Sequence, residues 1–152
     1  MLRGGKKKEL KEGKAPLQEW AERTRLKYLQ LPDDEYDAYA VLFVVGEEKD
    51  AVPVVVGYNN KNMDWIAVRA IIAQDTPMSY NLLEELNEFN DGTCGTKVVY
   101  NKLARSVDAI YEIPAKLATA EVIDFMIVDA AMTAARSRKI VEASCEPSPE
   151  FV

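Results

Sequence analysis

Three apolar stretches decide the fold: residues 39–45 read YAVLFVV, residues 52–58 read VPVVVGY, and residues 65–72 read WIAVRAII. β-Branched and aromatic residues of this kind favour strands. Short polar segments, 46–50 and 59–62, separate the three stretches and have the composition of turns. Consecutive strands joined by short turns pair antiparallel, because a parallel return needs a connection of about a dozen residues or more. The sequence therefore predicts an antiparallel meander.

Helical patterns flank this meander. Residues 16–31 carry apolar side chains at helical spacing, and a second amphipathic segment runs from Ser79 to about Gly92. Residues 97–103 and 107–113 predict a hairpin, and a long helix follows Thr119 as its N-cap and runs to about residue 140. The predicted order is α-β-β-β-α-β-β-α, an α+β fold with a five-stranded antiparallel sheet and the last helix packed on one face.

The chain of 152 residues is short enough for a single core, because chains divide into separate cores only beyond roughly 250 residues. Residues 1–14 carry six basic and two acidic side chains, whereas the whole chain has a net charge of -6. We expect a flexible basic arm over residues 1–14, one α+β domain over residues 15–141 and a flexible tail over residues 142–152.

The absent residue types exclude several chemistries. With no histidine, neither a Ser-His-Asp or Cys-His pair nor a histidine-bearing zinc site can form. Cys94 and Cys145 do not make a C-x-x-C pair. The sequence therefore predicts no catalytic residue, no metal and no cofactor.

Two classes of partner are also not expected. The longest near-apolar stretch, residues 38–46, is far shorter than the roughly 20 residues of a membrane helix, so a cytoplasmic protein with no membrane partner is predicted. The body of the chain is acidic and repels phosphates, and the basic arm has no aromatic residue to stack on a base. Nucleic acid is therefore not an expected partner.

Several polar residues of the second helix invite a functional interpretation. Asn87 and Asn90 lie near its end, where an amide side chain typically caps unpaired backbone groups, with ligand contact as the alternative. Glu84, Glu85 and Glu88 line its outer side, and a solvated helix face is favoured over acid-base or cation chemistry.

The second half of the chain resembles the YbjN-like domains, which share a fold with type III secretion chaperones. The resemblance rests on a helix ending in Leu86-Asn87-Glu88-Phe89-Asn90, on Lys97 opening the next strand, and on a terminal helix that starts with Leu117-Ala118-Thr119-Ala120-Glu121. It covers roughly residues 37–140. It implies an α+β domain that often dimerises and binds protein segments, with no catalytic residues.

We therefore expect a non-catalytic, chaperone-like or regulatory domain that binds a protein client or itself as a homodimer. The first strand is apolar on both faces, and the three predicted helices are not expected to cover both of them. The predicted partner-binding residues are therefore Tyr39, Val41, Phe43 and Val45 of this strand, together with Trp65. Self-association is expected through the sheet or the terminal helix. The alternative is a small-molecule-binding domain, or an enzyme that uses Asp, Glu, Lys or Tyr without His; a pocket gathering Arg69, Lys97 and acidic residues would favour it.

Overall fold

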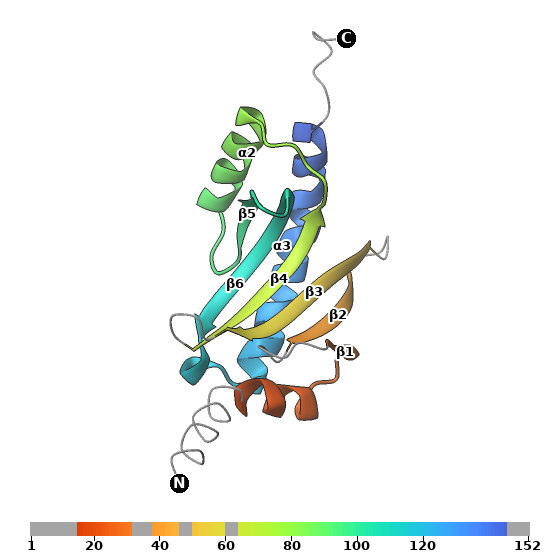
Figure 1. The fold of residues 1–152 in the computed structure, drawn as a ribbon, viewed down its shortest axis with the longest axis vertical. Coiled ribbons are helices and arrows are strands. Elements are labelled where there is room, and N and C mark those ends of the chain that lie inside the picture. The colour runs from red at the N-terminus through yellow and green to blue at the C-terminus, as the bar shows by residue number, and fades with distance from the viewer. Residues whose placement is uncertain (1–14, 32–37, 46–49, 60–63, 146–152) are drawn as a thin grey trace.

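A single antiparallel sheet with helices on one face makes up the fold (Figure 1). The computed structural model describes residues 15–31, 38–45, 50–59 and 64–145. A helix over residues 15–23 comes first. The remaining elements are β1 (Tyr28–Leu31), β2 (Ala38–Val45), β3 (Asp50–Asn59), β4 (Trp65–Ala73), α2 (Tyr80–Asp91), β5 (Lys97–Asn101), β6 (Ser106–Pro114), the 3-10 turn η1 (Ala115–Leu117) and α3 (Ala120–Cys145).

The sheet has six strands in the order β1-β2-β3-β4-β6-β5, and every neighbouring pair is antiparallel. The predicted α+β class, the meander of β2, β3 and β4 and the β5–β6 hairpin are confirmed. The predicted number of five strands is wrong, because β1 adds a sixth strand at the edge beside β2.

The additional strand arises where the first helix was expected to continue. That helix ends at residue 23 rather than at residue 31. The Thr24 side chain ends it, because its Oγ1 accepts a hydrogen bond from the Leu26 N–H at 3.1 Å and donates one to Asp124 Oδ1 at 2.9 Å. Residues 28–31 then extend and pair with β2, with Tyr28 opposite Val41. Helical spacing over residues 16–31 could not reveal this contact, because Asp124 lies 100 positions away.

The core lies between the sheet and α3, which runs behind the sheet in Figure 1. Alternate strand residues point toward α3, and those at the centre of the sheet are fully buried, among them Val54 and Val56 of β3 and Ile66 and Val68 of β4. The helix contributes Ile123, Met126, Ile127, Ala130 and Ala134 to this core. The predicted packing of the last helix on one sheet face is therefore confirmed.

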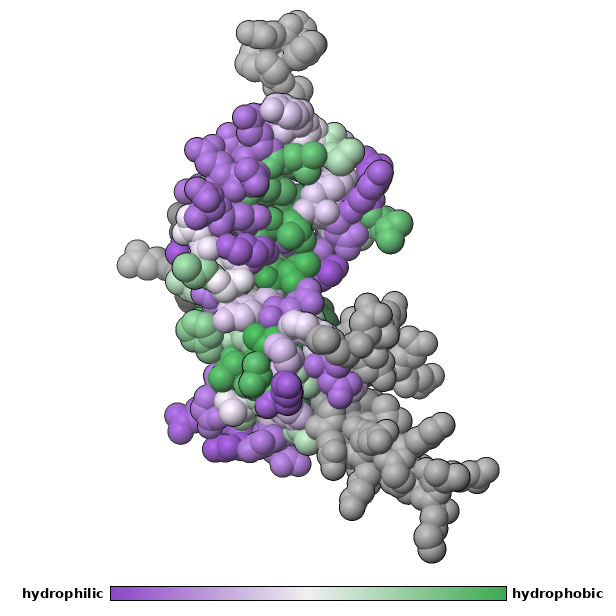
Figure 2. All heavy atoms as spheres, turned by 90° about the vertical axis from the view of Figure 1, so that its left-hand side faces the viewer, coloured by the Kyte–Doolittle hydropathy of each residue, from purple (hydrophilic) through white to green (hydrophobic). Residues whose placement is uncertain are grey.

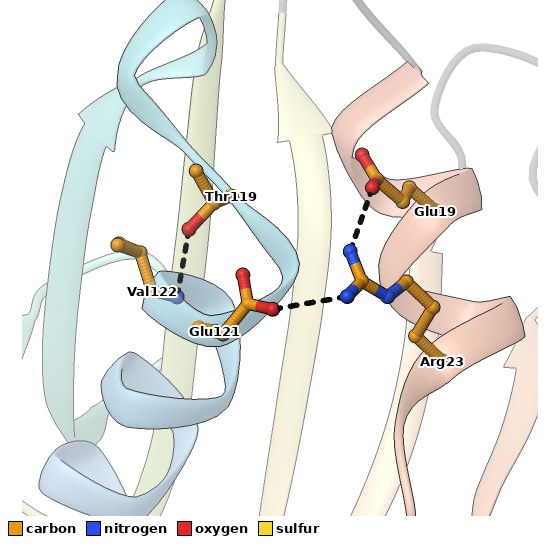
Figure 3. Close-up of polar contacts among 5 residues, drawn as sticks. All are labelled: Glu19, Arg23, Thr119, Glu121 and Val122. Atoms are coloured by element: carbon orange, nitrogen blue, oxygen red, sulfur yellow. Dashed lines mark hydrogen bonds and ion pairs between the residues drawn. The ribbon is translucent and has the colours of Figure 1, made fainter.

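The N-terminal helix packs against the beginning of α3. The Trp20 indole is fully buried, and its Nε1–H donates to Asp124 Oδ1 at 2.7 Å. On the surface, the Arg23 guanidinium lies between the carboxylates of Glu19 and Glu121, at 2.9 and 3.3 Å (Figure 3). Exposed ion pairs of this kind contribute little stability, so the buried indole is the main attachment.

The start of α3 matches its sequence signal. The Val122 N–H donates to Thr119 Oγ1 at 3.2 Å, so Thr119 is the predicted N-cap (Figure 3). The helix ends at Cys145, and residues 142–145 of the predicted tail therefore belong to it. The predicted basic arm, residues 1–14, and residues 146–152 lie outside the described residues. No helix in the described parts of the chain is long and apolar enough to cross a membrane.

The loop between α2 and β5 is anchored on α3. Thr96 is fully buried, and its Oγ1 donates to Asp129 Oδ2 of α3 at 2.5 Å. Gly95 has φ +79°, and a Cβ atom there would lie 2.8 Å from Cε2 of Tyr111. Only glycine fits this position without displacing the tyrosine ring, because both the backbone conformation and the space exclude a side chain.

Candidate partner-binding surface

The predicted partner-binding residues of β2 point toward the helices. Tyr39 and Val41 are buried, and Phe43 and Val45 are partly buried and pack on the core. The Trp20 and Tyr39 rings lie 5.5 Å apart in an edge-to-face arrangement. The prediction therefore chose the covered face of the strand. The physical reason is that β2 is apolar on both faces, so alternation alone could not tell which face the helices would occupy.

The opposite face of the sheet carries no helix of the described chain (Figure 1). We call it the open sheet face; at the β1–β3 end its exposed apolar residues are Leu29, Leu42, Val44, Ala51 and Pro53. Leu42 is 66% exposed and Val44 is 54% exposed. Trp65, the fifth predicted residue, pairs with Asn59 and Pro114, which places it on this face, half-buried.

The strand register shows that the open sheet face is apolar at the β1–β3 end and carries charged residues in its other half. One row crosses all six strands through paired residues: Leu29, Ala40, Val55, Arg69, Ile110 and Lys97. Its first three members are apolar, and its fourth is the guanidinium of Arg69. A contiguous apolar surface with a polar border is typical of protein-binding sites.

Beside Arg69 the open sheet face holds a pocket of about 370 Å3, lined by Arg69, Ile71, Gln74, Asp75, Ala104, Ser106 and Asp108. We call it the Arg69–Asp108 pocket. Arg69 Nη1 donates to Asp108 Oδ2 at 3.1 Å, and the Asp108 side chain is only 2% exposed. The other carboxylate oxygen, Oδ1, is buried without a hydrogen-bond partner among the described residues. Sequence reasoning named Arg69 but missed Asp108.

Both asparagines singled out on α2 and two of the three glutamates, Glu84 and Glu88, lie around a shallow groove that also includes Lys97, whereas Glu85 lines a different hollow. The Asn90 amide bonds both backbone groups of Val98 on β5: Nδ2 donates to the Val98 carbonyl, and the Val98 N–H donates to Oδ1, each at 2.7 Å. Lys97 Nζ donates to the carbonyls of Asn90 and Thr93, at 3.0 and 2.6 Å. The predicted role of Asn90 as a cap of the helix end is therefore wrong, because its amide bonds the backbone of the edge strand β5 instead.

The charged groups that a catalytic site would bring together are divided between two hollows, the groove and the Arg69–Asp108 pocket. Arg69 and Lys97 stand on opposite sides of Ile110 and line different hollows. Glu84 and Glu88 are exposed along α2, as a solvated face requires. No group of three or more Cys, Asp or Glu side chains that could hold a metal occurs in the described ranges.

One further polar contact lies where β3 ends and β4 begins. The Tyr58 hydroxyl donates to Asp64 Oδ1. Burial, with the neighbouring Asp64 carboxylate adding to it, raises the pKa of Tyr58 to about 12. Tyr58 therefore stays protonated and acts as a structural donor at neutral pH.

The helices carry apolar surface of their own. Phe125, Val128 and Met132 follow one another at helical spacing on the solvent side of α3, and they are 59%, 38% and 39% exposed. We call them the α3 stripe. Figure 2, seen from the side on which α2 lies, shows hydrophobic residues gathered in a band between hydrophilic ones. The molecule thus has more exposed apolar surface than the open sheet face alone.

Comparison with known proteins concerns the fold. No protein-family model and no curated protein matches the chain. Among solved structures, a chain in the crystal structure of the ExsC-ExsE complex matches with a TM-score of 0.59 and 19% sequence identity, over 84% of this chain and 91% of that chain. This likeness supports the α+β fold expected from the sequence, with six strands in place of five, whereas the resemblance to YbjN-like domains stays a prediction.

Proposed function

We propose that this protein is a non-catalytic, chaperone-like domain that binds an extended apolar segment of a client protein on the open sheet face. The observation that carries the proposal is the exposure of Leu29, Leu42 and Val44 together on one helix-free face. Apolar area left in water costs about 25 cal/mol per Å2, so covering this face with apolar side chains is favourable. The likeness to a chain of the ExsC-ExsE complex supports the same proposal at the level of fold.

An extended client segment fits this surface better than a helix does. Residues of one strand that share the open sheet face recur at every second position, as Leu42 and Val44 do on β2. They lie roughly 7 Å apart, which is also the spacing of same-face side chains in an extended segment. We expect the client to contribute apolar residues at alternate positions.

Replacing Leu42 by aspartate is expected to lower client capture about tenfold or more, because a charge would be buried in the apolar contact. The measurement is quantitative mass spectrometry of proteins retained by the tagged protein from its native host. Leu117→Asp is the matched control: Leu117 is 62% exposed but lies in η1, outside the strands of the sheet. Both variants should melt near the wild-type temperature, and equal retention by both would contradict the proposal.

We also propose that two copies associate through the α3 stripe, which leaves both open sheet faces free. Phe125 is the most exposed member, and its ring stands edge-to-face to Tyr111 at a centroid distance of 6.4 Å. An aromatic anchor with aliphatic neighbours on one helix is suited to a two-fold contact, in which each patch meets its own copy.

Light scattering is expected to report twice the 17.0 kDa chain mass for the wild-type protein and a single chain mass for Phe125→Asp. The reason is that the substitution places a carboxylate against its symmetry mate in the apolar contact. Leu42→Asp should remain dimeric, because it alters the other surface. A wild-type monomer across micromolar concentrations would overturn the dimer but not client binding.

A further inference from the structure

We propose that the Arg69–Asp108 pocket receives the carboxamide of a glutamine or asparagine in the client segment and thereby selects which segment binds. The inference rests on the proposed function, since it assumes that a client lies on the open sheet face. It adds a polar specificity contact to what is otherwise an apolar and unselective surface.

The starting observation is an unmatched acceptor. Asp108 lines the pocket with its side chain almost fully buried, and Oδ1 has no hydrogen-bond partner among the described residues. Buried polar atoms in folded proteins are nearly always hydrogen-bonded, so each unmatched one needs an explanation. A donor on the bound client supplies one.

The neighbouring Arg69 narrows the choice of donor. One of its N–H groups is taken by Asp108 Oδ2, and its side chain is 45% exposed, so the guanidinium offers further donors at the mouth of the pocket. The site therefore presents an acceptor next to a donor. A carboxamide matches both, because its NH2 donates to Asp108 and its oxygen accepts from Arg69.

Other client side chains match either the Asp108 acceptor or the Arg69 donor, but not both. A carboxylate would suit Arg69 but would face the negative Asp108, and an ammonium or guanidinium would suit Asp108 but would face the positive Arg69. An aliphatic side chain would leave Asp108 Oδ1 unsatisfied. The arrangement of charges thus favours the neutral amide.

The segments that line the pocket are held in place by hydrogen bonds between residues that do not line it themselves. The Thr76 N–H donates to the Arg105 carbonyl at 2.8 Å, which ties the segment after β4 to the β5–β6 turn. The Tyr100 hydroxyl donates to the Thr76 carbonyl at 2.7 Å, which ties it to β5. The segment after β4 is therefore held in one position beside the pocket, which favours specific recognition.

The sheet sets the spacing between the amide and the apolar contacts. Leu42 lies on β2 and Asp108 on β6, three strand intervals apart in the sheet order. At ~4.8 Å per interval this is about 14 Å, so the part of the client that leaves β2 and crosses the strands toward β6 covers it in about four extended residues at ~3.3 Å each. Side chains four positions apart in an extended chain point the same way. We expect the amide four residues from an apolar residue of the client.

The test is selection of a random twelve-residue peptide display library on the full-length protein. Selected peptides are expected to carry Gln or Asn four positions from an apolar residue and to bind Asp108→Asn roughly ten- to a hundredfold more weakly, because that variant loses the unmatched acceptor. Arg69→Met, at a half-exposed site, should weaken the same peptides. Asp91→Asn, an exposed position at the end of α2, is the matched control and should bind like wild type.

Each of the other possible results of the selection contradicts either the inference or the proposed function. Apolar peptides without a fixed amide, or peptides that bind Asp108→Asn as well as wild type, would overturn the inference and leave the proposed function standing. Enrichment of Lys or Arg at the fixed position would also overturn it, in favour of a cationic occupant. Selection of no peptide would count against the proposed function itself.

A second measurement tests the pocket without a client. N-acetylglutamine amide is titrated into the protein, and the NMR shifts of the Ser106, Asp108 and Ile110 amides are followed. We expect saturable shifts for this probe, and at least tenfold weaker ones for N-acetylglutamate amide and N-acetylalanine amide. Equal shifts from all three probes, or none, would overturn the inference even where peptides bind.

Discussion

Trp20→Ala is expected to lower the free energy of unfolding by about 3–5 kcal/mol, which is the usual cost of emptying a fully buried aromatic site. The indole has no exposed surface, and its ring lies 5.4 Å from the Tyr28 ring and 5.5 Å from the Tyr39 ring. Its removal also takes one of the two side-chain donors from Asp124, which leaves Thr24 as the other. Such a loss is a large part of the stability of a typical domain.

Urea unfolding followed by circular dichroism measures this effect. Trp20→Phe separates its parts, because it keeps an aromatic ring but loses the hydrogen bond to Asp124, and it should cost about 1–3 kcal/mol. Leu29→Ala is the control at an exposed apolar site and should change stability by no more than about 0.5 kcal/mol. A Trp20→Ala protein as stable as the Leu29→Ala protein would mean that the N-terminal helix contributes nothing to the fold.

Local signals predicted most of this fold. The turns around the central strands required antiparallel pairing, and Thr119 marked the start of α3 correctly. The strand β1 escaped prediction because its residues fit a helical spacing equally well. What ends the helix is the contact between Thr24 and Asp124, and no local pattern reveals contacts of that range.

The candidate site, like the fold, could be predicted from the sequence only in part. The apolar character of β2 was plain, and it correctly indicated a surplus of apolar surface. Which face stays open depends on where α3 and the N-terminal helix pack, so Leu42 and Val44 replace Tyr39 and Val41 as the surface residues. The one sequence signal for the pocket that could have been used is Asp108, a charged residue between the buried Val107 and Ala109.

The edge strand β5 shows how a single side chain can close a sheet. Unpaired N–H and C=O groups along an edge strand invite pairing with another chain. On β5 the Val98 backbone is instead bonded by the Asn90 amide from α2, which acts in place of a neighbouring strand. At the other edge, β1 is only four residues long, which limits the edge that it offers.

Asn90→Ala is therefore expected to lower the free energy of unfolding by about 2–3 kcal/mol, because two hydrogen bonds to a half-buried backbone are lost together. The Val98 amide should also exchange with solvent at least tenfold faster, since its N–H loses its acceptor and β5 loses its lateral support. Asn87→Ala is the matched control on the same helix: Asn87 is exposed, so stability should change by no more than about 0.5 kcal/mol. Asn90→Asp keeps the acceptor for the Val98 N–H but turns a carboxylate oxygen toward the Val98 carbonyl, so it should recover little of the loss. If Asn90→Ala left the Val98 exchange rate unchanged, the amide would not be what closes this edge.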